Sequence, residues 1–127
     1  MSLSLPSESD IDSVAISEGI VQLYLDSFGR RPTRTRTYVQ PQFAVCVLRD
    51  VLTAPERSLL HSGGGAEIET ARSIVNESID DRCVSIVEMQ TGRSVLSHLT
   101  QVRAQADIGV HFFLFDDGPV PHDVLRH

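Results

Sequence analysis

The stretch AEIETARSIVNESIDDRCVSIVEMQ, residues 66–90, decides the fold of this chain. Its apolar residues alternate three and four positions apart, which is typical of one face of an amphipathic helix. These residues are Ile68, Ala71, Val75, Ile79, Cys83 and Ile86. A helix of this length crosses a whole small domain. Gly92 predicts its end, because glycine adopts the left-handed conformation of a helix C-terminus without steric strain.

Segments with alternating apolar residues lie on both sides of the long helix and predict two β-hairpins. The first hairpin comprises strands at residues 33–39 and 42–50, with the turn at Gln40-Pro41. The second comprises strands at residues 93–102 and 108–116. In the last strand, four apolar residues line one face (Ile108, Val110, Phe112, Leu114) and His111, Phe113 and Phe115 line the other.

Two further helices are expected. The first begins between residues 8 and 12 and ends at Gly29. Its apolar stripe is Val14, Val21, Leu25 and Phe28, widened by Ile16, Ile20, Leu23 and Tyr24. The sequence Thr53-Ala54-Pro55-Glu56 is a capping box, which predicts a short helix to His61 with Leu59 and Leu60 facing inward. Residues 62–65 are expected to be a flexible hinge.

Together these elements predict an α+β fold in the order helix-β-β-helix-helix-β-β. The four strands form one antiparallel sheet packed against the helices, as a two-layer sandwich. We expect one domain over residues 11–117, a disordered N-terminus over residues 1–10 and a loose C-terminal tail over residues 118–127.

The composition limits the classes of function. The chain has 127 residues and a formal net charge of −6, which argues against a protein that binds nucleic acid through a basic face. No secretory signal and no apolar run of about 20 residues is found. The two cysteines, Cys46 and Cys83, occur in apolar patterns and are interpreted as buried free thiols. A cytoplasmic protein without direct membrane insertion is expected.

Four arginines crowd the segment after the first helix and form its most suggestive chemistry: Arg30, Arg31, Arg34 and Arg36. Guanidinium groups match carboxylate and phosphate geometry, so this cluster is a candidate site for an anion or an acidic partner. The alternative is a solvated strand edge paired with carboxylates elsewhere.

No catalytic residue is expected, because no serine lies in a nucleophile elbow and neither cysteine has a catalytic setting. His98 and His111 could meet across the second hairpin, but a zinc site needs a third protein ligand that the neighbouring sequence does not supply. A half-buried cross-strand pair is therefore expected, with no metal and no cofactor, and the chain is predicted not to be an enzyme.

The long helix also carries apolar residues off its main stripe, namely Ile74, Val84, Val87 and Met89. They predict a second buried face, either against the first helix or in a homodimer through residues 66–90.

The order of these landmarks resembles the MpsC-like domain family of bacteria. The resemblance covers about residues 16–116 and rests on FGRRPTRTRTYV, VLTAPERSLL, VEMQTGRSV and HFFLFD. Its structural signature positions are Gly29, Pro32, Thr53, Glu56 and Gly92. Arg31 stands where the family commonly has glycine, which argues against backbone-mediated ligand binding at that turn, and residues 101–107 also depart from the family pattern.

The resemblance implies a soluble accessory part of a system for membrane-potential generation and cation or bicarbonate uptake. It supplies no catalytic residues. The first functional hypothesis is therefore a non-enzymatic cytoplasmic accessory or regulatory domain that binds a protein partner, such as a membrane transport subunit. The alternative is a small-anion sensor that uses residues 30–36.

Overall fold

The computed structural model describes residues 8–116, and the predictions for residues 1–7 and 117–127 lie outside them. The elements are α1 (Glu8–Phe28), β1 (Arg34–Val39), β2 (Phe43–Arg49), α2 (Ala54–His61), α3 (Gly65–Thr91), β3 (Val95–Arg103) and β4 (Ile108–Phe115). The predicted α+β class and element order are confirmed. Residues 8–10, assigned above to the disordered N-terminus, are the first residues of α1.

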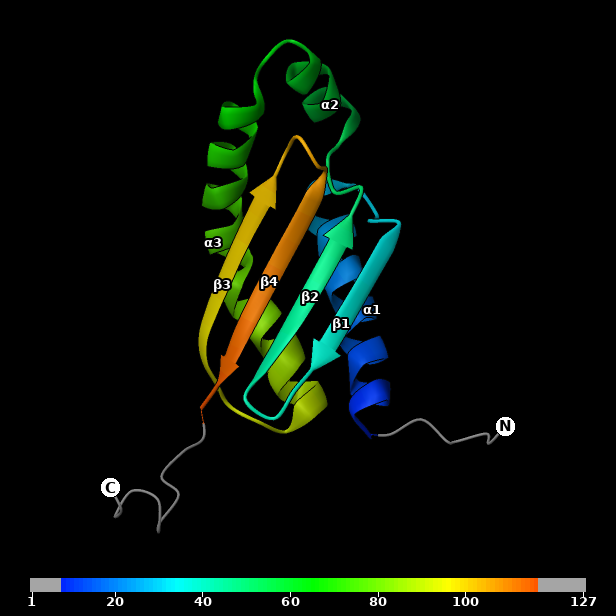
Figure 1. Cartoon of the computed structure of the whole chain (residues 1–127), viewed down its shortest axis with the longest axis vertical. Helices are drawn as coiled ribbons and strands as arrows, with labels where there is room; N and C mark the ends of the chain where they lie inside the picture. Colours follow the sequence, from blue (N-terminus) through cyan, green and yellow to red (C-terminus); the bar gives the residue numbers. More distant parts are fainter. Residues whose placement is uncertain (1–7, 117–127) are drawn as a thin grey trace.

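The four strands form one antiparallel sheet in the order β1-β2-β4-β3. Strands β2 and β4 join the two hairpins at the centre of the sheet, where Cys46 lies opposite His111 and Val47 opposite Val110. Helices α1 and α3 lie on the same face of this sheet, behind it in Figure 1, and contact each other as well as the strands. The fold is therefore a two-layer sandwich with one helix-covered face and one open face.

The long helix α3 ends as predicted, with Gly92 in the left-handed conformation at φ 70°. Its buried line differs from the predicted stripe and consists of Ile68, Arg72, Asn76, Ile79, Cys83 and Val87. The prediction was wrong at Ala71, which is exposed. The buried line is displaced by one residue in this part of the helix because polar Arg72 and Asn76 take core positions there.

Arg72 is buried because its guanidinium group has several partners. Both of its contacts with the Glu56 carboxylate measure 2.8 Å, and it also donates a hydrogen bond to the Val51 carbonyl oxygen. The group lies 3.9 Å above the centroid of the Phe28 ring. The predicted capping box is confirmed, since the Thr53 N–H donates to Glu56 at 2.8 Å and Glu56 N–H donates to Thr53 Oγ1 at 3.3 Å. Glu56 thus caps α2 and fixes α3 at the same time.

Three inward-facing assignments were wrong. Val14 and Leu25 were placed on the main stripe of α1 but are 61% and 37% exposed, because the helix turns its other apolar residues toward both β1 and α3. The core residues of α1 are the ones predicted to widen the stripe, Ile16, Ile20, Leu23 and Tyr24, together with Val21. Leu59 is exposed; α2 contains no buried residue, and its Leu60 packs only partly buried against the core.

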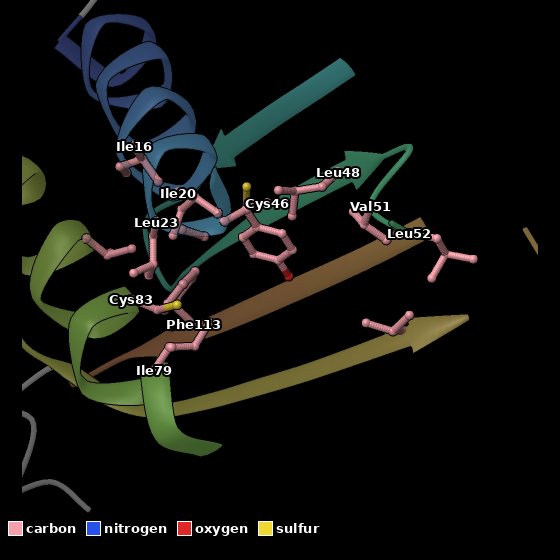
Figure 2. Packing of buried hydrophobic residues seen from close by; sticks show 14 of the residues in the cluster. Ile16, Ile20, Leu23, Cys46, Leu48, Val51, Leu52, Ile79, Cys83 and Phe113 are labelled. Atoms are coloured by element: carbon pink, nitrogen blue, oxygen red, sulfur yellow. The ribbon is translucent and has the colours of Figure 1, made fainter. Parts of the chain in front are cut away.

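The core lies between the helices and the covered face of the sheet (Figure 2). Ile16, Ile20 and Leu23 approach it from α1, and Ile79 and Cys83 approach it from α3 beside Phe113 of β4. Both cysteines are buried and free, as predicted. The alternating burial of β4 is also as predicted, with His111, Phe113 and Phe115 on the covered face.

Candidate functional site

One face of the sheet is left uncovered by the helices of residues 8–116 (Figure 1), and the centre of this open face is apolar. Alternation along the strands places on this face Tyr38 of β1, Phe43, Val45 and Val47 of β2, Leu99 of β3, and Ile108, Val110, Phe112 and Leu114 of β4. Phe43 and Phe112 stack with their ring centroids 5.6 Å apart. Tyr38 is half-exposed and Leu99 is 64% exposed, whereas the central side chains are half-buried. Contiguous apolar surface of this kind typically marks an interaction site.

One end of the same face is strongly cationic. Arg34 lies opposite Arg49, and Ile108 lies opposite both Arg49 and Arg103, so three arginines share one row across the four strands. Arg36 lies in the next row, opposite Val47. We call these four side chains the arginine row: Arg34, Arg36, Arg49 and Arg103.

The charges of the arginine row are only partly balanced within the described chain, where Arg34 acts on the nearby Asp50 carboxylate. None of the four strands contains Asp or Glu, and within residues 8–116 none of the four arginines forms a salt bridge. Like charges directly opposite each other on neighbouring strands destabilise a sheet, and Arg34 and Arg49 are such a pair. Carboxylates of a bound partner would relieve this repulsion. The open face is therefore suited to an apolar partner surface with acidic residues at one end.

The four arginines predicted to form one cluster lie in different surroundings in the structure. Arg34 and Arg36 join the arginine row, whereas the Arg30 guanidinium donates from Nε to the Asp50 carbonyl oxygen at 3.0 Å. The Thr33 hydroxyl donates to the Asp50 carboxylate, and this hydrogen bond, with nearby Arg34, Arg57 and Arg30, holds the pKa of Asp50 below its usual range. Arg30 thus ties the connection after α1 to the end of β2.

Arg31 lies in a separate groove between α1 and β1, with a volume of about 710 Å³. Arg36 also borders this groove, together with Asp10 and Glu18 of α1. The groove therefore combines both signs of charge. Arg30, Arg49 and Arg103 do not line it, so the groove and the arginine row can be tested with different variants.

Arg49 and Arg103 were missed because they are 54 residues apart in the sequence and belong to different hairpins. Their position near strand ends was the only sequence signal, and it gained meaning only through the pairing of β2 with β4. The signature residues Gly29 and Pro32 have structural roles: Gly29 ends α1 at φ 70°, and Pro32 is buried in the connection to β1.

His98 and His111 meet on the covered face, although they are not direct cross-strand partners. Their rings stack with centroids 5.1 Å apart, and His98 Nε2 lies 2.9 Å from His111 Nδ1. Burial, and next the neighbouring His98, lower the pKa of His111 to about 3, so His111 is neutral at pH 7. Cys83 of α3 adjoins this pair, and it supplies the third metal-ligating side chain that the neighbouring sequence lacked.

The sequence of this chain matches a known protein family. The family described as "Na+-translocating membrane potential-generating system (MpsC)" matches residues 13–117. The chain belongs to the MpsC family. Neither curated proteins nor solved structures show a significant match to it. In residues 8–116 of this MpsC-family chain, no helix combines the length and the apolar character needed to cross a membrane.

Proposed function

We propose that this MpsC-family chain is a non-enzymatic, cytoplasmic accessory or regulatory part of a membrane-potential-generating system, and that it binds a protein partner through its open sheet face. The proposal rests on one observation: the uncovered apolar centre and the arginine row lie on the same face of the sheet. The partner, a subunit of the membrane system, presents apolar side chains flanked at one end by Asp or Glu. Charge complementarity of this kind fixes register and accelerates association.

A second copy of the chain fits this face less well. The same face of a second copy brings arginines and no carboxylates, so the arginine row would remain unpaired. A homodimer through α3 stays a prediction, and the surface for it is smaller than expected because Val87 is buried in the core and Val84 packs against it. The exposed residues of the predicted set are Ile74 and Met89, about 22 Å apart along the helix.

The test is affinity purification of the tagged chain from its own host in mild detergent, followed by mass spectrometry. Leu99→Glu places a carboxylate in the apolar centre and is expected to abolish capture of a membrane-protein subunit. Ile74→Glu is the matched control, because Ile74 is also 64% exposed but lies on α3. Replacement of Arg34, Arg49 and Arg103 by Ala is expected to weaken capture at least 10-fold, whereas Arg82→Ala on α3 leaves it unchanged. Thermal melts verify that each variant is folded.

Capture of the same subunit by Leu99→Glu and by the arginine variant would contradict the assignment of this face. The absence of any membrane-protein partner for the wild-type chain would contradict the accessory role itself.

A small-anion sensor is the second candidate, and the groove with Arg31 and Arg36 is the observation that favours it. An anion that binds only the folded chain raises its melting temperature by mass action. Millimolar nucleotide, carboxylate or bicarbonate should then raise the melting temperature of the wild type and of Arg49→Ala, but not that of Arg31→Ala. No anion-dependent rise in the wild type would eliminate this candidate.

A further inference from the structure

We propose that Cys83, His98 and His111 form a binding site for one zinc ion at the interface of α3 with the sheet. The three residues come from α3, β3 and β4, and one donor atom from each lies within 4.8 Å of the other two. All three side chains are buried or nearly so. The site is independent of the open face, which lies on the other side of the sheet.

The hydrogen bonds of the two imidazoles leave one nitrogen of each ring for an ion. His98 Nδ1 contacts the Asp80 carboxylate, and His111 Nε2 lies 2.7 Å from the Tyr24 hydroxyl. The remaining nitrogens, His98 Nε2 and His111 Nδ1, face each other at 2.9 Å. In metal sites the second nitrogen of a histidine ligand is commonly held by a carboxylate or another polar group, which orients the ring. Asp80 and Tyr24 already hold these positions here.

The spacing suits a tetrahedral ion after small side-chain rotations. Ligand atoms around zinc lie about 3.5 Å apart, given metal–nitrogen distances of about 2.0 Å and metal–sulfur distances of about 2.3 Å. The two imidazole nitrogens are somewhat closer than this, and no pair in the cluster is farther apart than 4.8 Å. The ion would replace the hydrogen bond between the two histidines.

The proton balance of this step follows from the partners. His98 keeps its proton on Nδ1 and donates it to Asp80. The proton of neutral His111 moves from Nδ1 to Nε2, where the Tyr24 oxygen accepts it. Cys83 loses its thiol proton to solvent and binds as the thiolate, so one proton is released for each zinc bound.

The ligand set favours zinc over copper. One thiolate and two imidazoles suit both metals, but copper sites of this composition commonly add an axial methionine. Met89 is the methionine of the described chain, and it is 81% exposed on α3. Asp80, which holds His98 Nδ1, is partly exposed, whereas the His98 side chain is almost completely buried.

The test uses the full chain, freed of metal with a chelator and then titrated with zinc chloride alone. We expect one zinc per chain by elemental analysis after gel filtration, and at least a 10-fold loss of affinity in Cys83→Ala. Cys46→Ala is the matched control, because Cys46 is the other buried free thiol and lies outside the cluster; it should bind like the wild type. Asp80→Ala should lower affinity roughly 10- to 100-fold, as is typical when a partner of a ligating histidine is removed.

Cobalt in place of zinc gives a readout that needs no variant. Thiolate ligation produces a sulfur-to-cobalt charge-transfer band in the near ultraviolet, together with the visible bands of tetrahedral cobalt. A folded wild-type chain that binds no zinc, or a cobalt complex without the thiolate band, would overturn the proposal and leave a hydrogen-bonded histidine pair.

Discussion

Arg72 of α3 is the side chain that joins the three helices, through Glu56 of α2 and the Phe28 ring of α1. It is almost completely buried, and its charge is balanced by Glu56, whose carboxylate also caps α2. Partial burial raises the pKa of Glu56, but the hydrogen bonds from Arg72 and Thr53 outweigh this and lower it overall. Removing one partner of a buried ion pair leaves the other charge uncompensated, and this is strongly destabilising.

Arg72→Met should therefore lower the free energy of unfolding by about 3 kcal/mol. Arg57→Met is the matched control. Arg57 pairs with Asp107 at 3.2 Å, but its side chain is 41% exposed, so its loss should change the free energy by less than about 1 kcal/mol. Urea unfolding followed by circular dichroism measures both values. Equal effects of the two substitutions would show that burial of Arg72 does not determine its contribution.

At the level of elements, the crossing of α1 and α3 depends on Gly19. A Cβ atom at this position would lie 2.9 Å from Cγ2 of Ile86, a β-branched side chain with little freedom to move away. Glycine inside a helix costs about 1 kcal/mol relative to alanine, so close approach of the two helices is the physical reason for it here.

Gly19→Ala should consequently destabilise the chain by about 1 to 2 kcal/mol despite the better helix propensity of alanine. In an Ile86→Ala background the obstructing methyl group is absent, and Gly19→Ala should become neutral or stabilising. A double-mutant cycle by urea unfolding measures this coupling. If Gly19→Ala had the same effect in both backgrounds, the helices would not be in contact at this point.

The stability of the whole molecule should depend on pH through His111. The groups that face it are Tyr24 of α1, Cys83 of α3, Cys46 of β2 and His98 of β3. The pKa of His111 is about 3 in the folded chain and 6.5 in the unfolded chain. Between these values the unfolded state binds a proton that the folded state does not, so the contribution of His111 is complete above pH 6.5 and falls as the pH decreases.

With chelator present, we expect the free energy of unfolding to fall by up to about 1.4 kcal/mol per pH unit below pH 6.5. The lowered pKa values of Asp50 and Glu56 add a further loss at more acidic pH, where these carboxylates are protonated. His111→Gln should remove the pH dependence of the free energy of unfolding between pH 6.5 and 5. His61→Gln, at an exposed position, should retain it. Urea titrations at four pH values measure the slope, and an unchanged free energy across this interval would contradict a buried neutral His111.

Much of the fold was predictable because its signals are local. The Thr53–Glu56 capping box, the glycines after α1 and α3, and the alternation in β4 each act within a few residues of the chain, and the structure confirms them. The prediction failed where a polar side chain is buried. Ala71 was predicted to lie on the buried stripe, whereas Arg72 takes the core position, because the residues that neutralise Arg72 belong to other elements.

The candidate sites depended on contacts that local signals do not encode. The register between β2 and β4 brings Arg49 and Arg103 beside Arg34, and it places His111 against His98. The packing of α3 on the sheet then brings Cys83 to the two histidines. The sequence alone therefore determined the elements, their order and their ends, because short-range sterics and hydrogen bonding govern these. Only the tertiary structure decided which charges and ligands share a surface, because strand order and helix packing join residues that are far apart along the chain.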